Sequence, residues 1–348
     1  MIIHDNQGFG TQSLNSFFGI FHTYTGTVRF HSPKNTTGMR IIVWFLMVLR
    51  VFAYRRLPSA RSSTGLYSTR RQEITKYPRI FFNNKLSLNN VYVLGEEQSH
   101  YISNVMRLRV GAKMRIFDTL SCEYIASIGE INKKRSSLQV AVDIIEQIKD
   151  NTDKYARPLP ITLYCAPIKK QRMKLLLEKV TELGINLIVP IITQNTNDLS
   201  GINNAEANEK VLIESAEQSE RLHIPSISAP FKFADFLQNI CNGKSPCDNI
   251  SILLVCRERA DHSVLTIYNT LQKHYNGKSN IGILIGPEGG FTQEEFVIME
   301  KFSAMESNKV KILFTTLGDN MLLRSETAAI VAISHIQQYL HSLPTGTK

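Results

Sequence analysis

The chain has 348 residues, enough for two domains with substantial cores. Its formal net charge is +10, but residues 1–76 hold ten basic and two acidic side chains, so the rest of the chain carries only +2. Global charge therefore does not support RNA binding by the part of the chain after residue 76, and any RNA contact must depend on local patches. Five cysteines without a C-x-x-C pair and nine histidines without an H-E-x-x-H pattern predict neither a disulfide framework nor a metal site.

Residues 1–76 have the composition of a targeting leader. They are poor in acids, rich in Arg, Ser and Thr, and end in RRLPSARSSTGLYSTRR, which is typical of an organellar transit peptide. The apolar run Ile41–Leu49 is much shorter than the roughly 20 residues of a membrane span, so no stable membrane association is expected. A signal anchor and a disordered leader are the alternatives. Met39 is a second candidate start. We expect a mitochondrial protein, with a plastid, or the cytoplasm if the leader is not a transit peptide, as alternatives.

Residues 77–148 are expected to form a small β-barrel. Short apolar stretches separated by Asn, Gly and Lys-Arg turns predict its strands, at 79–82, 91–94, 113–117, 123–129 and 138–145. One helical turn is expected within 97–109. The polar stretch that follows closes with prolines and predicts a linker at 149–157.

From residue 158 to 341 the strand and helix patterns alternate. The expected strands are 161–167, 185–192, 250–256, 281–286 and 310–317, and the expected helices are 169–183, 206–222, 262–274, 293–304 and 325–341. The first helix stops before Gly184, a typical C-terminal glycine. The alternation predicts an α/β domain with a mainly parallel sheet, whose ligands bind beyond the carboxyl ends of its strands. A tail is expected at 342–348.

The stretch ILIGPEGGFTQEEF, residues 283–296, predicts a ligand-binding turn between a strand and a helix. Its glycines allow the backbone to approach a ligand, and Thr292 with Glu295 forms a capping-box pattern for the next helix. The stretch is neither G-x-G-x-x-G nor a phosphate-binding P-loop, which disfavours a dinucleotide enzyme. A tight turn without a ligand is the alternative.

The stretch LGDNMLLRSETAAIVAI, residues 317–333, also follows an apolar strand and opens a helix. Ser325 is the expected N-cap. Arg324 is unusual beside a helix N-terminus, where the dipole favours anions, so it predicts an anionic partner. A surface arginine paired with Glu326 is the alternative.

Two basic stretches are candidate RNA contacts, although charge runs are more often solvated faces. The first lies in the expected barrel and the second opens the first helix of the α/β domain; the candidates are Arg107, Arg109, Lys113, Arg115, Lys169, Lys170, Arg172 and Lys174. In ESAEQSERLHIP, Glu217, Gln218 and Arg221 are expected on one helical face near the end of a helix.

These motifs occur together, and in this order, in one family. From about Arg79 to Tyr339 the chain closely resembles the RsmE-type ribosomal RNA (uracil-N3)-methyltransferases of the SPOUT superfamily. The resemblance is carried by HYISNVMRLRVGAKMRIFD, KVTELGINLIVPI, AEQSERLHIP, LLVCRER, ILIGPEGGFTQEE and LRSETA. It implies a PUA-like RNA-binding barrel at 77–148 and a SPOUT methyltransferase domain at 158–341. It also implies a deep trefoil knot and a homodimer.

The resemblance implies S-adenosylmethionine as cofactor and assigns roles to residues. Cofactor-binding groups are expected at Ile285, Gly286, Gly290, Leu317, Gly318, Leu322 and Leu323. Arg324 and Glu326 are the expected catalytic residues, and Arg221 is a further candidate RNA contact. The family usually has Leu-Gly-Pro-Arg-x-Leu-Arg where this chain has LGDNMLLR at 317–324, one residue longer and without the first Arg. The implied partner is small-subunit, 16S-type ribosomal RNA, either free or in the assembled subunit.

Methylation at N3 requires the imide proton to leave as the methyl group arrives, with the uracil held out of its stack. Arg324 is expected to stabilise the charge that moves onto the imide, or to contact the neighbouring phosphate, and Glu326 to orient Arg324 or accept the proton. Two alternatives remain: a SPOUT enzyme that acts on another RNA base, and a non-catalytic RNA-binding factor in ribosome assembly.

Overall fold

The computed structural model describes residues 73–134, 137–152, 158–243, 250–257, 263–277, 279–305, 309–318 and 322–343. The predicted leader lies outside these residues up to position 72, as do Met39 and the end of the predicted tail. Among the described residues, none of the helices combines the length and the apolar character that a membrane crossing requires.

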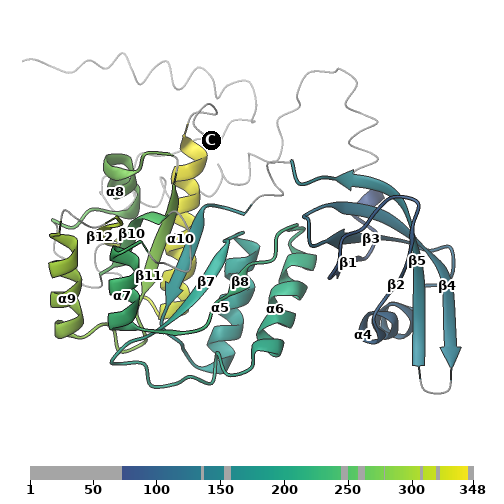
Figure 1. Cartoon of the computed structure of the whole chain (residues 1–348), viewed down its shortest axis with the longest axis horizontal. Coiled ribbons are helices and arrows are strands. Elements are labelled where there is room, and N and C mark those ends of the chain that lie inside the picture. The colour runs from purple at the N-terminus through teal and green to yellow at the C-terminus, as the bar shows by residue number, and fades with distance from the viewer. Residues whose placement is uncertain are drawn as a thin grey trace, which may run out of the picture. The chain divides into compact units, whose positions relative to one another are not determined.

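The N-terminal domain is a five-stranded sheet with the neighbour order β1 (Arg79–Phe82), β3 (Lys113–Asp118), β4 (Glu123–Lys134), β5 (Ser137–Lys149) and β2 (Val91–Val93) (Figure 1). β1 runs parallel to β3, and the other pairs are antiparallel. The inner face buries Ile, Val, Met and Tyr side chains such as Met114 and Ile128. All five expected strands are present, but β5 continues to Lys149, so its last residue takes the first position of the predicted linker.

The expected helical turn is a short helix, α4 (Glu96–His100), followed by one π-helical turn, η2 (Tyr101–Val105). Arg107, two residues after that turn, has a φ of 55°, a left-handed conformation that non-glycine residues rarely adopt. The chain then enters β3 through Gly111, whose φ is 84°. This connection places Arg107, Arg109 and Lys113 on the surface of the domain.

The second domain is a parallel sheet with the path β12 (Lys311–Thr315), β10 (Ile250–Cys256), β11 (Asn280–Ile285), β6 (Ile161–Cys165), β7 (Leu187–Ile192) and β8 (Ser226–Ile227), and β9 (Phe231–Lys232) pairs with β7. Among the described residues, every strand pair of this sheet is parallel. Successive residues of a strand point to opposite faces, so Leu163 joins one apolar cluster and Tyr164 the other. This confirms the predicted α/β class.

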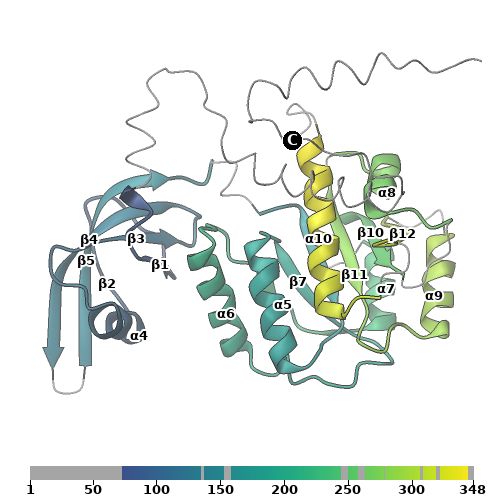
Figure 2. The same ribbon diagram turned by 180° about the vertical axis from the view of Figure 1, so that it is seen from behind.

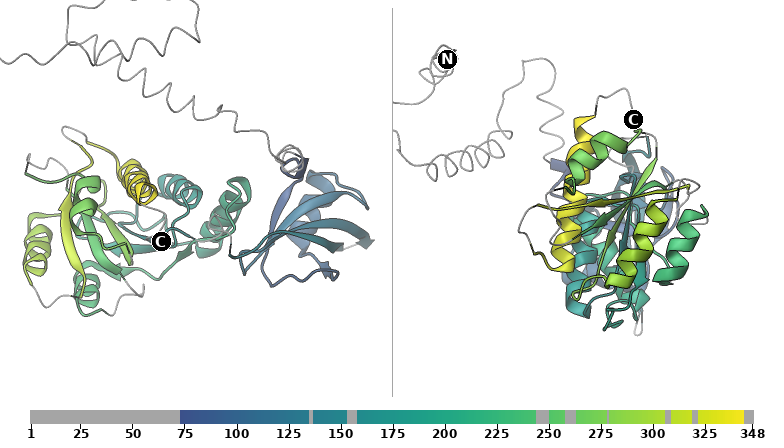
Figure 3. Two further views of the ribbon diagram at one scale, coloured as in Figure 1. Left: turned by 90° about the horizontal axis from the view of Figure 1, so that it is seen from above. Right: turned by 90° about the vertical axis from the view of Figure 1, so that its left-hand side faces the viewer.

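Helices cover both faces of this sheet. One apolar cluster joins the sheet to α5 (Lys170–Glu182), α6 (Ala205–Gln218), α8 (Ile267–His274) and α10 (Ser325–Ser342). The other cluster joins it to α7 (Phe233–Cys241) and α9 (Gln293–Ser303). Figure 2 shows α6, α5 and α10 side by side on one face, and the right-hand view of Figure 3 shows the sheet between its two helix layers.

One expected helix ends earlier than predicted, and one helix was not predicted. The helix expected at 206–222 ends at Gln218, because Glu220 adopts a left-handed φ of 59° and turns the chain. Arg221 therefore does not share a helical face with Glu217. Helix α7 was not predicted, although its buried side chains, Phe233, Phe236, Leu237 and Ile240, recur at helical spacing.

Candidate active site

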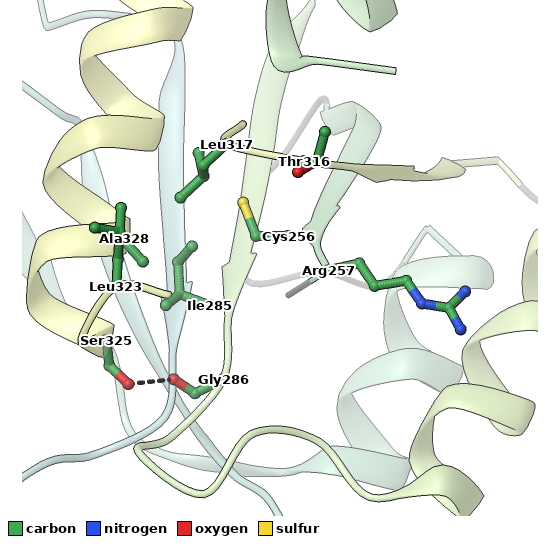
Figure 4. Close-up of a pocket in the computed structure, with 9 residues that line it drawn as sticks. All are labelled: Cys256, Arg257, Ile285, Gly286, Thr316, Leu317, Leu323, Ser325 and Ala328. Carbon is green, nitrogen blue, oxygen red and sulfur yellow. Dashed lines mark hydrogen bonds between the residues drawn. The ribbon is translucent and has the colours of Figure 1, made fainter. Parts of the chain in front are cut away.

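A pocket opens at the carboxyl edge of the parallel sheet, where β10, β11 and β12 end (Figure 4). It is an open hollow of about 430 Å³, a volume that includes the solvent at its mouth. Its lining residues come from the ends of those three strands and the start of α10: Cys256, Arg257, Ile285, Gly286, Thr316, Leu317, Leu323, Ser325 and Ala328. The site therefore lies where ligands bind in open α/β sheets.

One hydrogen bond joins the two loops that build this pocket. The Ser325 hydroxyl donates to the Gly286 carbonyl oxygen at 2.8 Å (Figure 4). Ser325 is the first residue of α10, and Arg324 holds the N-cap position without a side-chain cap. The prediction that Ser325 is the N-cap is therefore wrong, because its hydroxyl bonds a partner 39 residues away in the chain.

The loop after β11, residues 286–290, packs closely at its start. A Cβ atom at Gly286 would lie 3.1 Å from the ring of Phe291, so only glycine fits there without a shift. At the other end Gly290 has a φ of 68°. Its carbonyl oxygen and that of Gly289 accept hydrogen bonds from the Asn195 amide at 3.0 and 3.2 Å. The glycines thus form a tight turn, which is held by the side chain of Asn195 from the loop after β7.

The helix behind this loop begins with the predicted capping box. The Thr292 hydroxyl accepts from the Glu295 backbone N–H, and the Glu295 carboxylate accepts from the Thr292 N–H at 2.9 Å. The second carboxylate oxygen of Glu295 accepts from the Gln194 N–H at 2.8 Å. Glu295 is buried, and its single carboxylate bonds both the start of the helix and the loop after β7.

Four of the seven predicted cofactor residues line the pocket: Ile285, Gly286, Leu317 and Leu323. Gly290, Gly318 and Leu322 belong to the same two loops but do not line it. Leu322 is 63% exposed, and the Gly318 N–H bonds the Thr316 hydroxyl at 3.2 Å. Residues 319–321, which carry the departure from the usual family pattern, lie outside the described residues.

Sequence reasoning missed several lining residues. Cys256 and Arg257 follow β10, which lies between β11 and β12 in the sheet, and this neighbourhood is visible only once the strand order is known. Thr316 falls in the expected strand 310–317 and Ala328 in the LRSETA motif, but neither had an assigned role. Burial raises the pKa of neighbouring Cys165 to about 12, so that thiol stays protonated and is no candidate nucleophile.

Arg172 connects the two pocket loops through their carboxylates. Its guanidinium lies 3.3 Å from Glu288 in the loop after β11 and 3.9 Å from Glu326 in the first turn of α10. Arg172 extends from the start of α5, which packs against α10. The Glu288 side chain is about one-third exposed, consistent with a structural rather than a chemical role.

The two predicted catalytic residues lie in contrasting environments. Arg324 is exposed, and its side chain has no hydrogen-bond or ion-pair partner among the described residues. Glu326 is buried, and within the described part of the chain its second carboxylate oxygen accepts no hydrogen bond. A buried carboxylate oxygen without a donor is costly, which marks Glu326 as a group available to a ligand. No ion pair joins Arg324 to Glu326 in the described structure.

The predicted RNA contacts fall into three places. Arg107, Arg109 and Lys113 are exposed on the N-terminal domain, and Lys169 and Lys170 are exposed at the start of α5, near Arg172. Arg115 is buried in an ion pair, whereas Lys174 is exposed on α5. Arg221 is half-buried and donates two hydrogen bonds to the Glu182 carbonyl, at 3.0 and 2.8 Å, which leaves its predicted RNA contact without support from the geometry.

Among the described residues, no group of three or more His, Cys, Asp or Glu side chains could hold a metal ion. The pocket itself offers apolar side chains such as Ile285, Leu317 and Leu323; Arg324 and Glu326 do not line it but are the chain neighbours of the lining residue Ser325.

Comparisons with known proteins agree with this geometry. The RNA methyltransferase domain family matches residues 156–337, and the RNA methyltransferase PUA domain family matches residues 94–141. The ribosomal RNA small subunit methyltransferase E of Rickettsia conorii is 32% identical over 263 residues, which cover 75% of this chain and 96% of the relative. The enzyme of that name from Synechocystis is 27% identical over 247 residues, covering 70% of this chain and 72% of the relative.

Solved structures show the same fold. A putative methyltransferase from Legionella pneumophila, solved with the cofactor SAM, has a TM-score of 0.60 and 25% identity and covers 75% of this chain and 97% of its own. The ribosomal RNA small subunit methyltransferase E of Neisseria gonorrhoeae, bound to S-adenosyl methionine, has a TM-score of 0.60 and 23% identity with the same coverage. The chain belongs to the ribosomal RNA small subunit methyltransferase E family, with a PUA domain followed by an RNA methyltransferase domain.

Proposed function

We propose that this protein uses S-adenosylmethionine to methylate N3 of a uridine in 16S-type small-subunit ribosomal RNA, giving 3-methyluridine. The observation that carries the proposal is the pocket between the 286–290 loop and the start of α10, in a chain of this family. Two structural neighbours whose own structures contain S-adenosylmethionine support the choice of cofactor.

The residues present fit this cofactor. Ile285, Leu317 and Leu323 would supply an apolar wall for the cofactor, and the absent side chain at Gly286 would let backbone polar groups come within its reach. The buried, unpartnered oxygen of Glu326 lies at the start of the helix that closes the pocket. When bound, S-adenosylmethionine supplies the electrophilic methyl group.

The chain's own residues must then accept the proton that leaves N3 and stabilise the negative charge that develops on the uracil imide. We assign Arg324 to the charge that develops on the uracil imide, because it lies in the chain between the lining residues Leu323 and Ser325 and its side chain is exposed and free of partners in the described structure. Glu326 is the candidate acceptor of the N3 proton, with Arg172 close to its first oxygen at 3.9 Å. Arg107, Arg109, Lys113, Lys169 and Lys170 are the candidate contacts to RNA phosphates.

Three further features belong to the proposal. The family resemblance supports a homodimer and a deep trefoil knot in the C-terminal domain. The Arg-rich, acid-poor composition of residues 1–76 supports a mitochondrial location. Sedimentation of the purified protein measures the dimer, an experimental structure traced without breaks shows the knot, and imaging a fusion of residues 1–76 to a fluorescent protein shows the compartment.

Nucleoside mass spectrometry of small-subunit RNA, incubated with the purified protein and S-adenosylmethionine, tests the reaction. We expect 3-methyluridine to appear with the cofactor and to be absent without it. A different methylated nucleoside would point to another target base. Tight RNA binding without any methylated nucleoside would favour the non-catalytic assembly factor, an alternative motivated by the altered LGDNMLLR segment at 317–324.

A further inference from the structure

The ESAEQSERLHIP segment, residues 214–225, contains the end of α6 and contacts the N-terminal domain. Arg79, on β1, extends a fully buried guanidinium to the end of this helix and donates to the Ala216 carbonyl at 2.7 Å and the Arg221 carbonyl at 2.8 Å. The last carbonyls of a helix have no partner within the helix, and its C-terminus attracts cations. Arg79 therefore caps α6 from the neighbouring domain.

A buried carboxylate holds Arg79 in place. The Glu123 carboxylate, fully buried on β4, accepts from Arg79 at 2.6 Å and pairs with Lys149 at 2.7 Å. Burial alone would raise the pKa of Glu123, but Arg79 and Lys149 outweigh it and lower the pKa, so the group is ionised at neutral pH. The Arg79 guanidinium also lies over the Phe117 ring, 3.8 Å from its centroid.

Further contacts surround this pair. The Glu217 carboxylate accepts from the Phe81 N–H at 2.8 Å, satisfying a donor of the edge strand β1. Arg115 pairs with Glu220 at 2.8 Å, and an apolar cluster of Phe117, Ala216 and Leu222 lies beside them. Such burial is unusual, because domains of one chain normally move relative to each other unless their interface is large and apolar.

The same segment also contacts α5, at the end of that helix that lies away from the pocket. Arg221 bonds the Glu182 carbonyl at the end of α5, and the opposite end of α5 carries Arg172, which contacts both pocket loops. We propose that Arg79 is a positioning residue that holds the RNA-binding domain at one fixed placement relative to the pocket, and so determines which uridine is methylated. This inference rests on the proposed function, in which the N-terminal domain binds the RNA.

Three variants of the full chain test this role. Arg79→Gln removes the charge, whereas Arg79→Lys keeps an ion pair with Glu123 but cannot donate to all the carbonyls at once. Lys210→Ala is the matched control, because the Lys210–Glu97 pair also joins α6 to the N-terminal domain, at 3.0 Å, but is solvent-exposed. Each variant is first checked for cooperative thermal unfolding, and its S-adenosylmethionine affinity is measured by calorimetry.

The readouts are kcat and KM for small-subunit RNA, and the position of 3-methyluridine mapped along it. For Arg79→Gln we expect unchanged cofactor affinity, a fall of at least about tenfold in kcat/KM for RNA, and methylation spread over additional uridines, because small misplacements of a substrate are costly. Arg79→Lys should lie between Arg79→Gln and the wild type. Lys210→Ala should match the wild type.

A fourth variant keeps the proposal testable if Arg79→Gln does not fold. Glu220→Gln removes the link to Arg115 at a partly exposed position and should shift RNA KM and methylation position in the same direction, by less. Folded Arg79→Lys and Glu220→Gln proteins with wild-type KM and a single methylated position would overturn the positioning role. A wild-type protein that makes no 3-methyluridine would instead refute the proposed function.

Discussion

The two loops that meet at the pocket are held in different ways. The loop after β11 is bonded from three directions: the Asn195 amide, the Ser325 hydroxyl and Arg172 through Glu288. In the loop after β12, the described polar contacts involve only its first residues: Thr316 bonds Gly318 and, through its N–H, the Leu265 carbonyl at 3.0 Å, whereas Leu322 and Arg324 are exposed. One wall of the pocket is therefore built in advance by tertiary contacts, and the other presents exposed side chains.

This difference suggests that the two loops have separate roles, one in cofactor binding and one in the reaction. A wall fixed by backbone hydrogen bonds suits binding of a cofactor, since preorganisation lowers the entropic cost of association. A loop that ends in an unpaired arginine suits the changing charge of a reacting base, because that arginine loses no internal partner when it contacts RNA. Substitutions in the two loops should then separate turnover from cofactor binding.

The largest effect is expected at Arg324. Arg324→Ala should lower kcat by roughly 100- to 1,000-fold, the range for removing one group that stabilises developing charge. Since the side chain has no partner in the described structure, the melting temperature and S-adenosylmethionine affinity should stay at their wild-type values. Single-turnover methylation of small-subunit RNA measures the rate.

Arg324→Lys is the matched variant for this prediction. It keeps the positive charge but loses the planar fork of donors, so an intermediate rate is expected if the guanidinium contacts the imide or a phosphate. Wild-type turnover in Arg324→Ala would remove Arg324 from the mechanism and leave Glu326 as the remaining candidate of the pair.

A smaller effect is expected where the two loops touch. Ser325→Ala removes the hydrogen bond to the Gly286 carbonyl, which is worth about 0.5–1.5 kcal/mol. If the bond sets the shape of the cofactor wall, calorimetry should show S-adenosylmethionine binding weakened by roughly two- to tenfold. Ser325→Thr, which keeps a hydroxyl, should bind nearly as well as the wild type. An unchanged affinity in Ser325→Ala would mean that the bond serves only the fold.

The contrast between the loops also explains which features could be predicted from the sequence. The capping box of Thr292 and Glu295 and the stop at Gly184 depend on residues only a few positions apart, and both are confirmed. The Ser325 hydroxyl could have capped the helix, but it donates to the carbonyl of Gly286 in a distant loop instead. Sequence patterns therefore predicted these features correctly where the hydrogen-bond partner lies only a few residues away in the chain.

Long-range partners account for the other errors. Helix α6 ends four residues early, where Arg79 of another domain bonds its final carbonyls. Arg257 lines the pocket only because β10 lies between β11 and β12, an order that no spacing along the chain reveals. The missed helix α7 is different: Phe233, Phe236, Leu237 and Ile240 carry a readable helical pattern, which a periodicity count over 233–241 would have found.

The fixed wall also predicts a moderate loss of stability. Thr292→Ala removes the N-cap of α9 and should cost about 0.5–2 kcal/mol of unfolding free energy. For a domain of this size that corresponds to a melting temperature lower by a few degrees, roughly 2–4 °C per kcal/mol. Thr292→Ser keeps the hydroxyl and should restore most of the loss. Calorimetric melting of the three proteins distinguishes a cap from a side chain that only fills space.

The smallest effect is expected at Glu288, the acidic residue at the centre of the glycine-rich loop. Its pair with Arg172 joins two side chains that are each about one-third exposed, so Glu288→Gln should change stability by no more than about 1 kcal/mol. That difference should shrink at high salt, which screens exposed charges. Glu294→Gln, an exposed acid of the same region, is the control. A loss of kcat near that of Arg324→Ala, with cofactor affinity unchanged, would mean that Glu288 takes part in the reaction. That result would contradict the separate roles proposed for the two loops.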